Sequence, residues 1–165
     1  MHQDVRLIAR IGLHGQIGLG GVLPPWGPDA DDLAEFTHST AGGVLVMGWA
    51  TIQHLNGQQL TRGGRGLAVV TRVGMAVFGG THQPQERVGD RNSDFLHHPQ
   101  AALDHLVARF PNRTLWICGG ERVFTAFAPY CSRFQISRAD YDGRADTYLP
   151  VLPWMVAPDR AFLSA

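Results

Sequence analysis

The chain can be read outward from residues 17–36, IGLGGVLPPWGPDADDLAEF. The first part of this stretch is rich in glycine, and the prolines that follow exclude regular structure, so we expect a loop. An acidic pair, Asp31 and Asp32, then opens a segment with helical spacing, in which Leu33 and Phe36 share one face. The stretch therefore predicts a mobile loop that runs directly into an amphipathic helix.

Two interpretations of the acidic pair are open at this point. A carboxylate of Asp31 or Asp32 would cap the helix, because exposed N–H groups and the helix dipole favour negative charge there. Alternatively, a carboxylate bracketed by Trp26, Leu33 and Phe36 behind the loop would be a buried acid in an apolar pocket. Such a group can bind a flat, cationic, ring-nitrogen ligand and take part in proton transfer.

Length and composition indicate one globular domain that covers residues 1–165. Hydrophobic residues make up 44% and charged residues 17% of the chain, which excludes a disordered protein. The formal net charge is zero, so no general electrostatic attraction to nucleic acid or anionic lipid is expected. With no signal peptide and no apolar run of membrane length, we expect a cytoplasmic enzyme or binding protein, as a monomer or homodimer.

Several kinds of chemistry are excluded or disfavoured by residue type. All 14 basic residues are arginine, which excludes a Schiff-base or P-loop lysine mechanism. Cys118 and Cys131 lie in different expected elements without a CxxC spacing, so two reduced thiols are expected rather than a disulfide. The histidines show neither HxxxH nor HExxH spacing, so no metal ion is expected.

Through most of the chain, short apolar runs alternate with segments whose apolar residues have helical spacing. Strands are expected at residues 5–12, 44–47, 66–71, 115–118 and 133–139, and helices at 31–39, 49–55, 99–110 and 121–130. Residues 75–78 could add a strand, whereas residues 79–94 have the composition of a long surface loop. Strands that alternate with helices at this spacing predict an α/β fold with a mostly parallel central sheet flanked by helices.

Three of the expected strands end in residues suited to phosphate. Gly119 and Gly120 lie between a strand and a helix, where bare backbone and free N–H groups can approach a phosphate. The other two ends carry Gly48 with Thr51 and Thr71 with Arg72. Each pair alone is common in structural roles, but together they indicate a dinucleotide across the edge of the sheet. Arg72 would suit a 2′-phosphate, since a guanidinium forks onto phosphate oxygens; a solvated surface arginine is the alternative.

The order of these pieces resembles the dihydrofolate reductase family over roughly residues 5–150. The motifs that carry the likeness are LIARIGLHGQIG, LPPW, DDLAEF, VLVMG, GRGLAVVTR, WICGGERVF and ADTYLP. The resemblance implies a single-domain dihydrofolate-reductase-like fold and NADPH-dependent reduction of a 7,8-dihydropterin, first of all dihydrofolate, with hydride transfer to C6 and protonation of N5. The alternatives are another dihydropterin, such as dihydromethanopterin, and a pterin- or nucleotide-binding protein without turnover.

The resemblance also implies the site residues. Asp32 matches the family's acid, which binds the pterin's 2-amino group and N3, while Leu23 and Trp26 belong to the loop that closes over both rings. Substrate-binding positions are implied at Ile8, Ala9, Asp32, Leu33, Phe36, Leu55, Arg65, Cys118 and Ser137. Cofactor-binding positions are implied at Ala9, Ile17, Gly18, Leu23, Gly48, Trp49, Thr51, Val70, Thr71, Arg72, Cys118, Gly119, Gly120, Glu121, Arg122, Val123 and Phe124. Of these, Arg65 would hold the α-carboxylate of the folate glutamate.

The chain also departs from the family pattern. Extra residues before the acidic pair leave Asp31 as a rival for the acid. Trp49 stands where the family has a basic residue that contacts the cofactor's phosphates, so Arg72 would contribute more to 2′-phosphate recognition. Arg10 lies in the first strand where a small residue is usual. Residues 151–165 are too few for the family's C-terminal hairpin, and we expect them to pack over the sheet edge instead.

Overall fold

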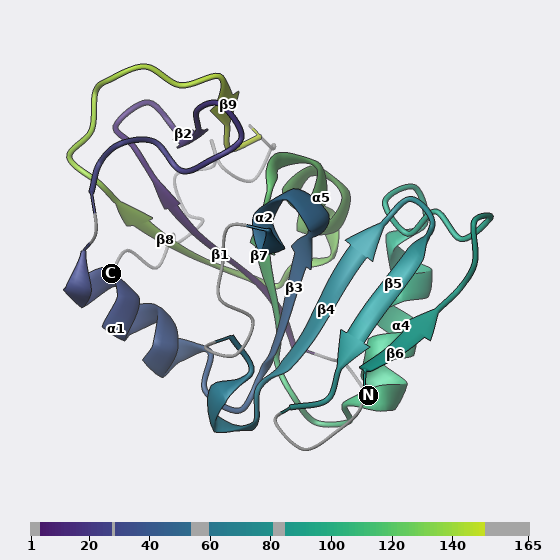
Figure 1. Cartoon of the computed structure of the whole chain (residues 1–165). Coiled ribbons are helices and arrows are strands. Elements are labelled where there is room, and N and C mark those ends of the chain that lie inside the picture. The colour runs from purple at the N-terminus through teal and green to yellow at the C-terminus, as the bar shows by residue number, and fades with distance from the viewer. Residues whose placement is uncertain (1–3, 28, 54–59, 81–84, 151–165) are drawn as a thin grey trace.

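A seven-stranded sheet forms the centre of the molecule (Figure 1). The computed structural model describes residues 4–27, 29–53, 60–80 and 85–150. The strands of this sheet are β1 (Val5–Ile11), β3 (Val44–Gly48), β4 (Gly66–Thr71), β5 (Gly74–Phe78), β6 (Gln85–Val88), β7 (Leu115–Gly119) and β8 (Arg133–Arg138). Their spatial order is β6-β5-β4-β3-β7-β1-β8.

The sheet is parallel from β4 to β8, and at the other edge β5 alone runs in the opposite direction, so it pairs antiparallel with both β4 and β6. Strand β1 illustrates the register, because its Leu7 lies beside Ile117 of β7 on one side and Phe134 of β8 on the other. The helices are α1 (Ala30–Ser39), α2 (Trp49–Ile52), α4 (Pro99–Arg109) and α5 (Glu121–Phe127). The predicted α/β fold with a mostly parallel sheet is therefore confirmed.

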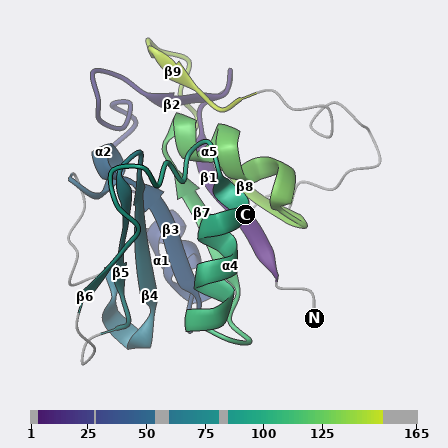
Figure 2. The same ribbon diagram turned by 90° about the vertical axis from the view of Figure 1, so that its right-hand side faces the viewer.

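The central strands bury both of their faces, as their continuous apolar runs indicate. Because successive side chains of a strand point to opposite faces, Val44 and Val46 of β3 pack on one side, and Leu45 and Met47 pack on the other. Figure 2 shows α4 and α5 lying together against the first of these faces. We call this the α4/α5 face, and the opposite one, which carries α1 and α2, the α1 face.

The α4/α5 face contains most of the hydrophobic core. Pro99 occupies the first turn of α4, where its missing N–H costs nothing, and helical spacing then places Ala102, Leu103 and Leu106 on the sheet. Leu106 is 0% exposed, as is Phe127 at the end of α5. Each such side chain contributes about 1.5–3 kcal/mol through burial, so this face accounts for much of the stability of the fold.

On the α1 face, α1 begins at an acid that the sequence analysis did not select. The carboxylate of Asp29 accepts hydrogen bonds from the backbone N–H groups of Asp31 and Asp32, at 3.0 and 3.1 Å. The expectation that Asp31 or Asp32 caps the helix is therefore wrong, because the helix begins one residue earlier than expected, at Ala30. With Asp29 as the N-cap, Asp32 is left free to turn toward the sheet from the first helical turn.

Other elements differ from the expectations in local ways. Residues 79–94 were expected to form a loop, but they contain β6, whose alternating pattern is short and largely exposed. The expected helix at 121–130 ends in a separate 3-10 turn at Ala128–Tyr130, where Pro129 removes an N–H donor. A second, two-stranded sheet joins β2 (Gln16–Gly18) to β9 (Thr147–Tyr148), and neither strand was expected.

Some expectations fall outside the described residues or stay predictions. Leu55, with the end of the helix expected at 49–55, lies outside the described residues, and so does the segment 151–165. Three expectations stay predictions: that one domain covers residues 1–165, that the protein is cytoplasmic, and that it is a monomer or homodimer. Among the described residues, none of the helices combines the length and the hydropathy that a bilayer crossing needs.

Candidate active site

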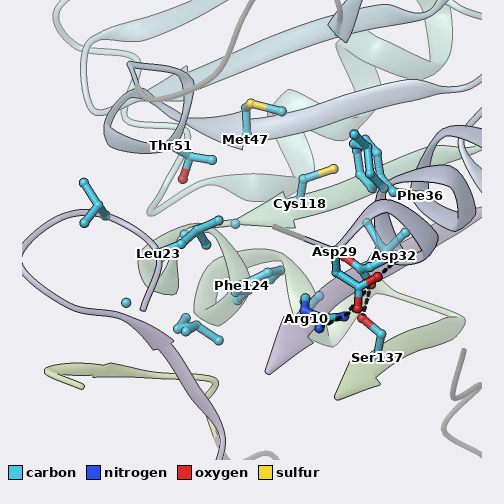
Figure 3. Close-up of a pocket in the computed structure, with 18 of the residues that line it drawn as sticks. Arg10, Leu23, Asp29, Asp32, Phe36, Met47, Thr51, Cys118, Phe124 and Ser137 are labelled. Atoms are coloured by element: carbon cyan, nitrogen blue, oxygen red, sulfur yellow. Dashed lines mark hydrogen bonds and ion pairs between the residues drawn. The ribbon is translucent and has the colours of Figure 1, made fainter. Parts of the chain in front are cut away.

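A cavity of about 950 Å³ lies between α1, the loop that begins at Ile17, and the carboxyl ends of the central strands (Figure 3). A volume of this size is at the upper end of the range for small-molecule sites. Its position is the one expected for an open parallel sheet, where ligands bind outside the carboxyl ends of the strands. The cavity exists because none of the residues that the structure describes in α1 is fully buried against the sheet.

The wall of the cavity is mostly apolar. Ile8 and Met47 come from the sheet, while Leu33 and Phe36 come from α1. Leu33 is 65% exposed and Phe36 is partly buried, so both side chains leave room for a flat ring between the helix and the sheet. The structure thus brings together the apolar residues that the resemblance assigned to the substrate.

Asp32 provides a carboxylate to the cavity, close to the sheet. The hydroxyl of Ser137 in β8 donates a hydrogen bond to Asp32 Oδ1 at 2.6 Å, and the Asp32 side chain is 26% exposed. Asp31 is exposed and does not belong to the cavity lining. Of the two rival acids, Asp32 is therefore the one that the helix presents to a bound molecule, and its partner is the hydroxyl that the sequence suggested.

Arg10 changes the character of this acid. Along β1, Arg10 lies two residues after Ile8 and shares its face, so its side chain reaches the cavity. Its Nη1 lies 3.2 Å from Asp32 Oδ1, and its Nη2 lies 3.0 Å from Asp29 Oδ2. Figure 3 shows this group of four side chains, with Ser137, on one side of the cavity. The expectation of a carboxylate with only apolar neighbours is therefore wrong, because a guanidinium enters the site from the sheet.

The electrostatics of the helix start follow from these contacts. Hydrogen bonds from the backbone N–H groups of Asp32 and Asp31, together with the charge of Arg10, hold the pKa of Asp29 below its ordinary value. The Arg10 guanidinium also lies 5.8 Å from the centroid of the Trp26 ring, within cation–π range. Trp26 in turn meets Tyr141 edge-on, with ring centroids 6.0 Å apart. Arg10 thus links the acid, the helix start and the loop.

The glycine pair after β7 lines the cavity with bare backbone. Gly119 has a φ of 115°, and a Cβ there would lie 3.1 Å from the Phe124 ring. A Cβ on Gly120 would approach Thr51 Oγ1 to 3.4 Å. Larger residues would therefore fill the space beside Thr51 and Phe124, both of which line the cavity. A ligand can approach the main chain closely here, as the sequence motif predicted for a phosphate-bearing molecule.

Arg65 and Cys118 line the same cavity but are held by their own contacts. Arg65 Nη1 donates to Thr40 Oγ1 at 3.0 Å, and burial lowers the pKa of Arg65 from its ordinary value. The thiol of Cys118 donates to the Trp116 carbonyl, and burial raises its pKa to about 12. Cys118 is therefore a neutral wall residue at neutral pH and has no nucleophilic role in this arrangement.

The loop over the cavity is fastened to the segment around β9. The carboxylate of Asp146 accepts a hydrogen bond from the Gly20 N–H at 2.9 Å, and Gln16 pairs with Tyr148 across the small sheet. Leu23, at the tip of the loop, is 64% exposed. Figure 3 shows Leu23 and Asp32 on opposite sides of the cavity, so a ligand between them would contact both.

Most of the expected site residues meet at this cavity. Those that line it are Ile8, Ala9, Ile17, Gly18, Leu23, Trp26, Asp32, Leu33, Phe36, Thr51, Arg65, Cys118, Gly119, Gly120, Glu121, Phe124 and Ser137. Those outside its lining are Gly48, Trp49, Val70, Thr71, Arg72, Arg122 and Val123. Val70 and Val123 point into the core of the α4/α5 face, and Arg72 is exposed in the turn after β4.

Two of the residues outside the cavity belong to a smaller pocket. Trp49 and Thr71 line a space of about 250 Å³ at the antiparallel edge, together with Val69 and Arg87. The sequence analysis assigned both residues to cofactor phosphates, and the structure separates them from the glycine pair by placing them around this other pocket. Arg87 was missed because its strand, β6, was expected to be a loop.

Other residues of the main cavity were not predicted from the sequence. Asp29, Gln135 and Thr147 line it, and Met47 and Leu60 complete its apolar wall. The signal for Asp29 was present, since an aspartate directly before a helical pattern is a common N-cap. The others have no local signal, because they reach the cavity only through the packing of distant elements.

Comparison with known proteins agrees with this geometry. The sequence matches the family described as "Dihydrofolate reductase" over residues 4–157. It is also similar to a protein named "Dihydromethanopterin reductase" from Methylorubrum extorquens, with 29% identity over 161 residues. That match covers 93% of this chain and 94% of the relative.

Proposed function

The chain belongs to the dihydrofolate reductase family, and we propose that it reduces a 7,8-dihydropterin to the tetrahydro form by hydride transfer to C6 and protonation of N5. The observation that carries this proposal is the placement of Asp32. Its carboxylate accepts a hydrogen bond from Ser137 at 2.6 Å and, together with the apolar side chains of Leu33 and Phe36, lines a cavity large enough for two ring systems. A group of this kind can fix the orientation of a nitrogen heterocycle and influence its protonation.

The side chains of the cavity divide the work as follows. Asp32 would accept hydrogen bonds from the 2-amino group and N3 of the pterin, and its negative charge would favour the N5-protonated form. Leu33 and Phe36 of α1 would pack on the ring and exclude water from the reacting carbon. Leu23, on the loop, would close the opposite side of the site. A proton would reach N5 from solvent while the ring is held in this orientation.

The residues around the glycine pair fit a nicotinamide cofactor, which supplies a hydride when bound. Gly119, Gly120 and Thr51 leave the backbone accessible, and the space beside them would be filled by a Cβ at either glycine. This cradle and the acid line the same cavity, so cofactor and pterin rings would share one enclosure. NADPH is the cofactor that we propose, with Arg72 as the cation that distinguishes it from NADH.

Arg72 offers a direct test of cofactor choice. Since its guanidinium would bind only the 2′-phosphate, Arg72→Ala should raise the KM for NADPH by about tenfold, the scale of one charged hydrogen bond, and leave that for NADH unchanged. Arg133→Ala, at an exposed arginine at the start of β8 that lines neither pocket, serves as the matched control. Equal effects of Arg72→Ala on both cofactors would remove Arg72 from this role.

The identity of the pterin tail is the finer part of the proposal. Dihydrofolate was the first expectation from the sequence, but the likeness to the Methylorubrum protein favours dihydromethanopterin. Arg65, buried beside Thr40, would then face a tail without the benzoyl-glutamate of folate. We therefore propose dihydromethanopterin as the preferred substrate and dihydrofolate as the weaker one.

Steady-state kinetics with both pterins test the activity and its preference. The purified chain is mixed with NADPH and either substrate, and oxidation of the nicotinamide is followed by absorbance. We expect turnover with both, and a kcat/KM for dihydromethanopterin at least about tenfold higher, equivalent to about 1.4 kcal/mol of differential transition-state binding. Oxidation no faster than in a protein-free mixture, for both pterins, would overturn the proposed activity. A higher kcat/KM for dihydrofolate would overturn the preference alone.

A further inference from the structure

Arg10 brings a positive charge into the part of the cavity where the ring of the substrate is proposed to bind. Its side chain is 19% exposed, compared with 26% for Asp32 and 40% for Asp29. The pair that is best shielded from water is therefore Arg10 with Asp32, and its electrostatic interaction is the less screened of the two. Asp29, in contrast, is exposed and already serves as the N-cap of α1.

Arg10 is held by two carboxylates and by one aromatic ring. Both terminal nitrogens point to acids, whereas Nε is buried and has no hydrogen-bond partner among the described residues. An unpaired buried donor is unfavourable, so the guanidinium is held in this place by the two acids and by the Trp26 ring. Its charge is thus directed at Asp32 and is not dispersed over other acceptors.

The consequence for Asp32 concerns hydrogen-bonding capacity as well as charge. Oδ1 accepts a hydrogen bond from Ser137 and forms the ion pair with Arg10, whereas Oδ2 has no partner among the residues that the structure describes. A carboxylate without a cation nearby favours a ligand that carries a positive charge and donates to both oxygens. Asp32 offers one uncommitted oxygen and a negative charge that Arg10, shared with Asp29, offsets in part.

We propose that Arg10 selects the charge of the heterocycle, so that the site accepts a neutral 2-amino-4-oxo ring and disfavours a cationic 2,4-diamino ring. This inference rests on the proposed function, because it names the ring class that the same site accepts. The physical reason is the repulsion between a cationic ligand and the guanidinium at 3.2 Å from Asp32 Oδ1. A neutral lactam ring is not repelled by the guanidinium and needs only the free oxygen of Asp32 as an acceptor. Arg10 acts on the ligand through Asp32 and is a specificity residue without a part in the chemistry.

Two ligands of the same size separate charge from shape. 6-Methylpterin presents a neutral lactam edge, and 2,4-diamino-6-methylpteridine replaces its oxo group by an amino group and binds a carboxylate in the protonated form. Their dissociation constants are measured by calorimetry at neutral pH, in buffers of different ionisation enthalpy, so that the protons taken up on binding are counted. The proteins are the wild type, Arg10→Met, Arg10→Lys and Arg138→Met.

The variants are matched to the question. Arg10→Met keeps an unbranched side chain about as long as the arginine stem and removes the charged guanidinium, whereas Arg10→Lys keeps the charge. Arg138 is an exposed arginine one residue after Ser137, and it does not line the cavity, so Arg138→Met removes a nearby charge that does not face Asp32. An effect of general surface charge would appear in this control as well.

In the wild type we expect the neutral ring to bind at least as tightly as the diamino ring. In Arg10→Met the affinity for the diamino ring should rise by about tenfold or more relative to the affinity for the neutral ring, which is the scale of one charged hydrogen bond. Binding of the diamino ring to this variant should take up about one proton. Arg10→Lys and Arg138→Met should both keep the wild-type ratio. A purely structural role of Arg10 would weaken both rings equally and would not change proton uptake.

Three results would overturn the inference. One is a wild type that already prefers the diamino ring with uptake of a proton. Another is an unchanged ratio of the two dissociation constants in Arg10→Met while the wild type still turns over a dihydropterin, which would leave the proposed function intact. The third is binding of neither ring to any of the proteins, together with no turnover, which would overturn the proposed function as well.

Discussion

On one face of the sheet, α4 buries Ala102, Leu103 and Leu106, whereas on the other face none of the described residues of α1 is buried. The two helices are of similar length, and both lie against strands with continuous apolar runs. The difference lies in what fills the space between helix and sheet. Under α4 it is filled by side chains of the core, and under α1 it is left as the cavity.

Apart from the partly buried Phe36, hydrogen bonds hold α1 to the sheet. Ser137 of β8 donates to Asp32 in the first turn, and Gln135, two residues earlier on the same face of β8, donates to Ser39 in the last turn at 2.8 Å. Arg65 reaches Thr40, just beyond the helix, at 3.0 Å. A helix held at its two ends can stand away from the sheet. The comparison therefore indicates that the α4/α5 face supplies stability and the α1 face supplies the site.

Asp32→Asn should separate activity from stability most strongly. We expect turnover with the preferred dihydropterin to fall by about two to four orders of magnitude, the usual contribution of a positioned acid or base. The midpoint of thermal unfolding should change little, because Asp32 is not part of the core. Asp31→Asn, with an exposed side chain outside the cavity, is the control and should behave like the wild type. If the two variants exchange these results, Asp31 is the acid.

Leu106→Ala should have the opposite effect, with lower stability and an almost unchanged kcat. Removal of a fully buried side chain from α4 leaves a hole in the α4/α5 face, and we expect the free energy of unfolding in urea to fall by about 2–5 kcal/mol. The kcat of the remaining folded protein should stay within about twofold of the wild type, since this residue is on the far side of the sheet from the cavity. A large loss of kcat under conditions where the variant is folded would contradict the division between the faces.

Leu33→Ala is the matching truncation on the α1 face. Because Leu33 is 65% exposed and lines the cavity, its loss should alter the free energy of unfolding by no more than about 0.5 kcal/mol. The KM for the pterin should rise by about tenfold, since the ring would lose an apolar contact worth about 1.5 kcal/mol. Urea unfolding and steady-state kinetics on the same preparation give both values. An unchanged KM would show that the ring does not contact α1 at this position.

Asp4→Asn should have the smallest effect, at the amino end of β1 and away from the cavity. A hydrogen bond and the charge of Arg6, with further bonds from Ser132 and Thr114, hold the pKa of Asp4 below its ordinary value of 3.8. A lowered pKa means that the ionised form stabilises the fold above pH 3.8 and that this contribution disappears as the pH falls below it. Because the group is partly exposed, the substitution should cost less than about 1 kcal/mol at neutral pH and nothing in acid. Urea titrations at both pH values provide the measurement, and a cost that persists in acid would indicate a different cause.

The strands could be predicted because their signal is local. Runs such as 44–47 and 115–118 are apolar at every position, as a strand buried on both faces requires, and both were placed to within one residue. The edge strand β6 was missed since an exposed strand carries no such run. The helices were found for the same reason, but periodicity could not show that α1 would leave its apolar face open.

The acid could be predicted and its environment could not. DLAEF identified Asp32 through family resemblance and helical spacing, whereas the contacts that define its charge come from far along the chain. Arg10 is separated from Asp29 by 19 positions, and Ser137 from Asp32 by 105. The sequence showed that Arg10 departs from the family pattern, since it is an arginine inside an apolar strand. Only the fold shows that its partner is Asp32.

The central claim is that this cavity holds a dihydropterin for hydride transfer to C6, and isotope transfer tests it most directly. Reduced nicotinamide with deuterium at the transferable C4 position is mixed with the chain and dihydromethanopterin, and the tetrahydropterin product is analysed by NMR. We predict one deuterium at C6 in the wild-type product, and the same position but a far lower yield with Asp32→Asn. Deuterium at C7, or oxidation of the nicotinamide without label in the pterin, would contradict the account.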